Sequence, residues 1–138
     1  MIVFILPNFS GGGAERVALN IFLQLHNKGY PLKLVVFSNK GNLISMIPSG
    51  VNLINLKTNS LRRSIFPLLK VIYKIRPSVI FSTFGYVNLA LLAFRSFMPR
   101  NIKIWAREAN FPLESTKNNS YQKVIRFGYR YLYSKLDL

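Results

Sequence analysis

The first thirty residues constrain the fold of this chain more than any other segment. Ile2–Leu6 is continuously apolar, which is typical of a strand covered on both faces in a parallel sheet. Pro7 and three glycines separate it from a stretch whose apolar residues recur at helical spacing, namely Ala14, Val17, Ala18, Ile21, Phe22 and Leu25. Gly29 then suits the left-handed residue that ends a helix. This strand, loop and helix predict the opening of an α/β domain.

The rest of the chain continues the alternation of strands and helices. We expect further strands at Leu32–Phe37, Val51–Leu56, Ser78–Ser82 and Ile102–Ala106, with "SNKGN" as a turn. We expect further helices at Leu61–Ile75, Val87–Phe97 and Tyr121–Lys135. The prediction is one domain over residues 1–138, α/β in class, with a Rossmann-like, doubly wound and mostly parallel sheet.

Composition narrows the possible chemistry. Half of the 138 residues are hydrophobic, which excludes a disordered tail. The chain has no cysteine, a single histidine (His26) and four acidic residues. Disulfides, thiolate metal sites and cysteine nucleophiles are therefore ruled out, and a histidine-based triad is nearly so. We expect no metal and no cofactor.

The formal net charge of +15 is unevenly distributed. Residues 1–60 contain five basic residues and one acid, whereas residues 61–138 contain fourteen and three. Such a field favours an anionic partner, either nucleic acid, an acidic membrane surface or a phosphorylated substrate; general solubility is the alternative. The apolar stretch Val79–Phe97 includes Arg95 and several polar residues, so any membrane contact is expected at the surface.

Ligands of open parallel sheets bind beyond the carboxyl ends of the strands. Here those ends are Pro7–Gly13, Thr83–Asn88 and Arg107–Leu113. The glycines stand before a helix start, whose free N–H groups favour an anion, so we expect anion contact there; a tight turn is the alternative. Arg16 replaces the third glycine of the dinucleotide fingerprint, and no Gly-Lys-Ser/Thr follows, so both familiar phosphate motifs fail.

Two charged segments lie near these strand ends. Glu15 is the only acid before residue 108, and at a helix start its charge favours the helix dipole. Arg107 and Glu108 directly follow the fifth predicted strand. They are either site residues or a local pair that caps the sheet, and the sequence leaves both readings open.

Several segments resemble the N-terminal domain of family 4 glycosyltransferases, which have the GT-B fold. The segments are "PNFSGGGAERVALNI" followed by "GYPLKLVVF", then "IRPSVIFSTFGYVN" and "IWAREANFP". Ser78 stands where the family usually has Asp, and Arg107-Glu108 stands where many members have a catalytic histidine. The resemblance covers nearly the whole chain.

The resemblance implies a metal-free transfer, with retention, from a nucleotide-sugar donor to a glycan or lipid-linked acceptor. It assigns the donor diphosphate to Gly12 and Gly13, supported by Gly11. It places the acceptor against a wall whose candidates are Thr83, Tyr86, Asn88, Arg107, Glu108 and Asn110. The catalytic residue stays unknown, with Glu108 and Arg107 as candidates.

Lipid-linked acceptors of cell-surface polysaccharide or glycolipid assembly lie at anionic membranes. The chain is therefore expected in the cytoplasm, either free or peripheral on the inner face of the cell membrane. Two predicted helices carry basic faces that could dock there, and the alternative is that both are ordinary solvated faces. Their residues are Arg62, Arg63, Lys70, Lys74, Lys123, Arg126 and Arg130.

The family's second domain carries a Glu-x7-Glu motif, which this sequence lacks. We therefore expect an N-terminal domain that is truncated at its C-terminal end and inactive alone, with the nucleotide-sugar-binding domain on a longer chain or a separate subunit. The alternative function is a basic nucleotide- or nucleic-acid-binding α/β module without catalysis. No nucleic-acid-binding motif is present, so a nucleic-acid partner is not favoured.

Overall fold

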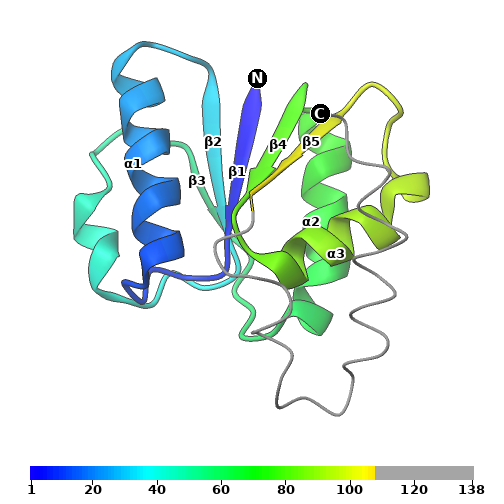
Figure 1. The fold of residues 1–138 in the computed structure, drawn as a ribbon, viewed down its shortest axis with the longest axis horizontal. Helices are drawn as coiled ribbons and strands as arrows, with labels where there is room; N and C mark the ends of the chain where they lie inside the picture. Colours follow the sequence, from blue (N-terminus) through cyan, green and yellow to red (C-terminus); the bar gives the residue numbers. More distant parts are fainter. Residues whose placement is uncertain (108–138) are drawn as a thin grey trace.

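A computed structural model describes residues 1–107, which form a five-stranded sheet with three α-helices (Figure 1). The strand order is β3-β2-β1-β4-β5, and every neighbouring pair is parallel. The strands are β1 (Ile2–Leu6), β2 (Leu32–Val36), β3 (Leu53–Asn55), β4 (Val79–Ser82) and β5 (Lys103–Ala106). The predicted α/β, Rossmann-like sheet is confirmed.

The helices cover the two faces of the sheet separately. They are α1 (Gly13–Asn27), α2 (Leu61–Ile75) and α3 (Gly85–Ala93), with the short 3₁₀ turns η1 (Asn42–Met46) and η2 (Arg95–Phe97). Helix α1 and η1 pack on one face, and α2 and α3 pack on the other (Figure 1). The connections change faces between the neighbouring strands β1 and β4. That change is the topological switch at which open α/β sheets bind ligands.

The apolar run of β1 is explained by burial on both faces. Val3 and Ile5 contribute to the core under α2 and α3, whereas Phe4 and Leu6 contribute to the core under α1. On the α1 side, the rings of Phe4 and Phe22 meet edge to face with centroids 5.3 Å apart. Such alternation requires apolar residues at every position of a central strand.

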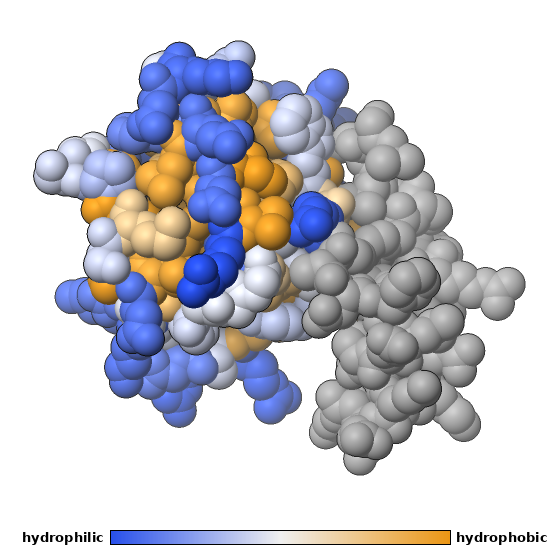
Figure 2. All heavy atoms as spheres, turned by 60° about the vertical axis from the view of Figure 1, so that its left-hand side comes forward, coloured by the Kyte–Doolittle hydropathy of each residue, from blue (hydrophilic) through white to orange (hydrophobic). Residues whose placement is uncertain are grey.

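The outer surface of α1 is polar along one stripe. Its exposed residues include Arg16, Asn20, Gln24 and Asn27, spaced by four, four and three residues. Figure 2 turns this side of the molecule forward and shows a hydrophilic band across a largely hydrophobic surface. This pattern is that of an amphipathic helix packed on a sheet.

Most predicted elements agree with the structure within two residues at each end. Helix α2 spans Leu61–Ile75 as predicted and includes Pro67 in its interior. Gly29 follows α1 with a φ of +78°, in the left-handed region expected there. The predicted helix Tyr121–Lys135 lies outside the described residues. In residues 1–107, no helix combines the length and the apolar character that crossing a membrane requires.

The predicted helix Val87–Phe97 is wrong at its C-terminal end, where it extends four residues too far. Helix α3 begins at Gly85 and ends at Ala93, after which η2 turns the chain toward β5. The guanidinium group of Arg95 donates hydrogen bonds to three carbonyl oxygens in the connection to β5, those of Pro99, Arg100 and Ile102. This network favours a turn over a longer helix. The 3₁₀ turn η1 was also not predicted.

Candidate functional site

A cleft of about 340 Å³ opens where the strands end. Tyr86 from the start of α3 lines it together with residues from three loops. The polar lining residues follow β1, β2 and β3 in turn and are Asn8, Ser38, Lys40, Thr58, Asn59 and Ser60. Pro7, Phe37 and Leu61 provide apolar walls. The cleft therefore lies at the carboxyl edge of the sheet, where the fold class places ligand sites.

Backbone hydrogen bonds join the three loops into one wall. The Ser38 amide donates to the carbonyl oxygen of Pro7 at 3.0 Å, and the Thr58 amide donates to that of Phe37 at 2.8 Å. The Phe9 amide donates to the carbonyl oxygen of Lys40 at 2.8 Å. Lys40 is thus fixed at the backbone to the loop after β1, while its side chain is exposed.

Gly41 permits this close approach of two loops. Its φ is +122°, and a Cβ added there would lie 2.1 Å from the carbonyl carbon of Phe9. No side chain fits at that distance. In the sequence this segment, "SNKGN", indicated only a turn. The signal that could have shown more is the lysine directly before the glycine, beyond a buried parallel strand.

The polar lining is preorganised by short-range hydrogen bonds. The side-chain oxygen of Asn8 accepts from the Ser10 amide at 2.9 Å and from the Ser10 hydroxyl. The Ser64 hydroxyl donates to the carbonyl oxygen of Ser60 at 2.8 Å. Because that hydrogen is used, Thr58 is the donor in its own hydrogen bond with Ser64. The hydroxyl oxygen of Thr58 can therefore accept a hydrogen bond from a ligand, and the side-chain NH₂ group of Asn8 can donate one.

The glycine loop forms the turn into α1. Gly11 has a φ of +101°, Gly12 is the N-cap, and Gly13 is the first helical residue. The carboxylate of Glu15 folds back over this start, since a Cβ added at Gly12 would lie 2.5 Å from Glu15 Oε2. Its negative charge opposes an anion at Gly12.

Gly13 is the open part of this loop. A Cβ added there would meet nothing within 4 Å. The Arg16 Nε–H points back to the Gly11 carbonyl oxygen, at 3.5 Å, so a cation flanks the glycines. Contact between the donor diphosphate and Gly11, Gly12 and Gly13 remains a prediction, with Gly13 the most accessible position.

Of the residues predicted to form an acceptor wall, Tyr86 lies in the cleft. Its side chain is half exposed. Partial burial raises the pKa of Tyr86 to about 12, and the negative charge of Glu15 adds to the shift. The phenol is therefore neutral at physiological pH and can both donate and accept a hydrogen bond.

Other predicted wall residues connect elements of the fold. Thr83 is buried, and its hydroxyl donates to the carbonyl oxygen of Ala14 at 3.3 Å, across the switch between β4 and α1. Asn88 is buried as well, and its Nδ2 donates to the carbonyl oxygen of Arg107 at 3.4 Å. Arg107 is exposed at the end of β5. Glu108 and Asn110 lie outside the described residues.

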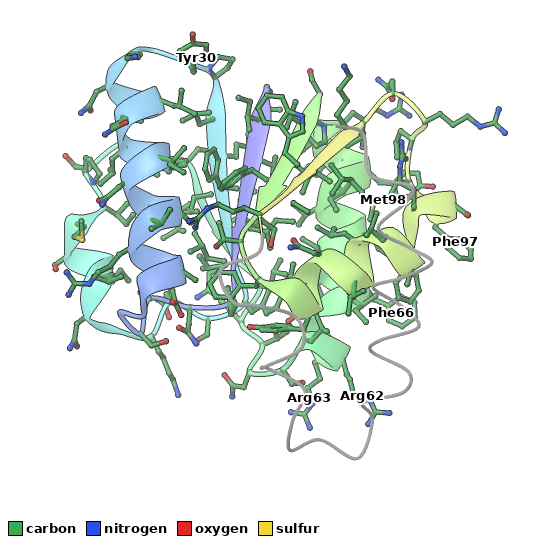
Figure 3. All side chains as sticks on the ribbon, in the orientation of Figure 1. Tyr30, Arg62, Arg63, Phe66, Phe97 and Met98 are labelled. Atoms are coloured by element: carbon green, nitrogen blue, oxygen red, sulfur yellow. The ribbon has the colours of Figure 1, made fainter. Side chains whose placement is uncertain are left out.

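The basic face predicted on α2 is exposed. We define the α2 outer face as Arg62, Arg63, Phe66, Lys70, Tyr73 and Lys74, all of which are exposed. Phe66 is 78% exposed, which is unusual for a phenylalanine. Figure 3 shows Arg62 and Arg63 at the start of α2, with Phe66 further along the same helix. The second predicted face, Lys123, Arg126 and Arg130, lies outside the described residues.

The lining chemistry of the cleft suits binding. It supplies one ammonium group, hydroxyls, amides and a phenol, and no carboxylate or imidazole. Residues 1–107 contain no cluster of three His, Asp or Glu residues that could hold a metal ion. Comparisons of the chain with protein-family models, with curated proteins and with solved structures found no match.

Proposed function

We propose that this chain is the acceptor-side domain of a glycosyltransferase that moves a sugar from a nucleotide-sugar donor, with retention, to a glycan or lipid-linked acceptor. The polar cleft at the carboxyl edge of the sheet carries this proposal, since hydroxyls and amides from three loops suit a polyhydroxylated ligand. The resemblance of the glycine segment to family 4 glycosyltransferases gives the reaction type. The setting would be cell-surface polysaccharide or glycolipid assembly.

In this proposal the site is shared with a second domain. Gly13 would face the donor diphosphate, and Tyr86 would contact the acceptor. The rest of the nucleotide site would come from a domain on a longer chain or on a separate subunit. Arg107 and Glu108 remain the candidates for chemistry, because the lining of the cleft has no carboxylate or imidazole. The chain alone is then expected to be inactive.

The test combines this chain with the polypeptide encoded directly downstream and supplies labelled nucleotide-sugars with lipid-linked acceptors. We expect transfer by the combination and none by the 138-residue chain. Gly13→Asp adds a charge at an open position and should abolish transfer without unfolding, whereas Gly13→Ala tests space alone and should retain most activity. Turnover by the isolated chain, or equal activity of the two variants, would contradict the proposal.

One observation favours a second candidate, a nucleotide-binding module without catalysis. Glu15 is the only acid in residues 1–107, and it does not line the cleft. Binding of nucleotide by the isolated chain, with no transfer by the combination, would favour this candidate.

We also propose that the domain works at an anionic membrane, on its cytoplasmic side. The α2 outer face supports this, because it combines four cations with two exposed aromatic side chains and no acid. Basic and aromatic residues on one helix face are typical of surface attachment to lipid.

A further inference from the structure

The charged side chain in the lining of the cleft is a cation. Lys40 is the charged residue of its lining, and all other polar groups there are neutral. Leu61, the first residue of α2, also lines the cleft. The carboxylate of Glu15 lies instead over Gly12. Its charge also acts on Tyr86. An anionic ligand is therefore favoured in the part of the cleft that Lys40 lines and opposed at Gly12.

The size of the cleft limits the ligand. A volume of about 340 Å³ lies at the lower end of the range for small-molecule sites. Such a space holds one sugar unit with a small substituent. Thr58 is arranged to accept a hydrogen bond and Asn8 to donate one, as the ring hydroxyls of a sugar require.

The kind of cation favours phosphate over carboxylate. Arginine recognises a planar carboxylate with two parallel hydrogen bonds, whereas lysine binds phosphate as a compact point charge. Ser60 and Leu61, at the start of the 15-residue helix α2, also line the cleft. A helix start adds N–H groups and a dipole that favour phosphate in the same cleft.

We propose that this cleft binds a phosphorylated sugar, with the Lys40 ammonium group on the phosphate and with Asn8 and Thr58 on the sugar hydroxyls. The assignment of this ligand to the acceptor rests on the proposed function, whereas the binding itself does not. The phosphate belongs either to a free sugar phosphate or to the linkage between sugar and lipid carrier.

The test is a titration of the 138-residue chain with hexose 1-phosphate, followed by calorimetry and by amide chemical shifts. Shifts are expected at Ser38, Lys40 and Thr58. Lys40→Ala should weaken binding about tenfold or more, because a hydrogen bond to a charged group is lost. Lys70→Ala is the matched control, since it removes the same charge from the α2 outer face, and it should change affinity less than twofold. Lys40→Arg should retain part of the affinity.

Three companion ligands make the test specific. Neutral hexose, hexuronate and inorganic phosphate should each bind at least tenfold more weakly than hexose 1-phosphate. Equal affinity for any of them would overturn the proposal, as would equal losses in Lys40→Ala and Lys70→Ala. Amide spectra of each variant establish that it is folded.

A fourth ligand distinguishes the two sources of the phosphate. It is the same sugar linked by diphosphate to a short prenyl chain. Tighter, Lys40-dependent binding of this compound supports the lipid-linked source, and equal affinity supports the free sugar phosphate. Failure of the proposed function is separate. If the chain binds sugar phosphate through Lys40 but supports no transfer with the second domain, the binding site is supported and the proposed transferase function is contradicted.

Discussion

At Gly41 the absence of a side chain allows two loops to approach each other closely. Gly41→Ala should lower the free energy of unfolding by about 2 kcal/mol or more, because a positive φ and a severe overlap act together. The Cβ would lie 2.1 Å from the Phe9 carbonyl carbon. Urea denaturation, followed by circular dichroism, measures the loss.

The matched control is Gly13→Ala. At this helical position an added Cβ has nothing within 4 Å, so the change should be neutral or slightly stabilising. Equal destabilisation by both alanines would mean that the contact between Gly41 and Phe9 does not determine the loop arrangement. Because Lys40 precedes Gly41, the same variant should also weaken binding in the cleft.

Tyr86 offers a prediction on pH. Its phenol should titrate near pH 12, compared with about 10 in an unfolded chain. The raised pKa stabilises the fold fully below pH 10, and this contribution is lost as the pH rises from 10 to 12, where the unfolded chain has already released the proton. Carbon NMR of labelled tyrosine rings measures the titration, and Tyr86→Phe identifies the resonance.

Glu15→Gln separates the two causes of this shift. Burial is the larger cause and the charge of Glu15 the smaller one, so the variant should lower the pKa of Tyr86 only in part. A return to the ordinary value would mean that charge, and not burial, dominates at this end of the cleft.

At the scale of elements, Arg95 determines where α3 gives way to η2. Its guanidinium group donates to three carbonyl oxygens at 2.9–3.1 Å. Arg95→Ala should cost about 2 kcal/mol of unfolding free energy, since several hydrogen bonds from a charged donor are lost. Thermal unfolding measures this, with Arg100→Ala as the control, because Arg100 is an exposed arginine five residues away.

Arg95→Lys sharpens the comparison. A lysine keeps the charge but lacks the planar fork that reaches several carbonyl groups at once. It should recover less than half of the loss. Full recovery by lysine would indicate that the charge alone, and not the fork, is what the turn requires.

The elements predicted from sequence are those whose pattern is repeated over many residues. The continuous run of β1 and the periodic stripes of α1 and α2 each count several apolar positions, so their burial could be foreseen. The boundaries of α3 could not be foreseen, because they depend on a hydrogen bond from the Arg95 side chain to the carbonyl oxygen of Ile102, seven residues further along the chain. Tertiary contacts of this kind leave no periodic signal.

At the scale of the molecule, the edge that carries the cleft was predictable but its lining was not. Parallel strands bring their carboxyl ends together, so the glycine loop and Tyr86 could be assigned to one edge. Lys40 and Thr58 follow different strands, and Gly41 determines how closely the loop of Lys40 approaches the loop after β1. The sequence indicated only turn residues at several of these polar positions, because the lining of the cleft is formed by contacts between loops that are distant in the sequence.

The charge of the whole molecule leads to a prediction on membranes. Flotation with vesicles that contain anionic lipid should recover the chain, and neutral vesicles should not. Each basic residue near such a surface contributes about fivefold in affinity, so alanine at all four cations of the α2 outer face should weaken binding at least one-hundredfold. Raising the salt concentration should weaken it as well, because exposed charges are screened.

The decisive comparison keeps the net charge equal and changes its location. A second variant carries alanine at four exposed cations on other elements, Lys28, Lys57, Arg100 and Lys103. If the α2 outer face docks on lipid, this variant should lose much less binding than the first one. Phe66→Ser should reduce binding in addition, because a mostly exposed ring can bury apolar area only in the membrane. Equal losses in the two fourfold variants would mean that binding depends on the net positive charge of the protein and not on the α2 outer face.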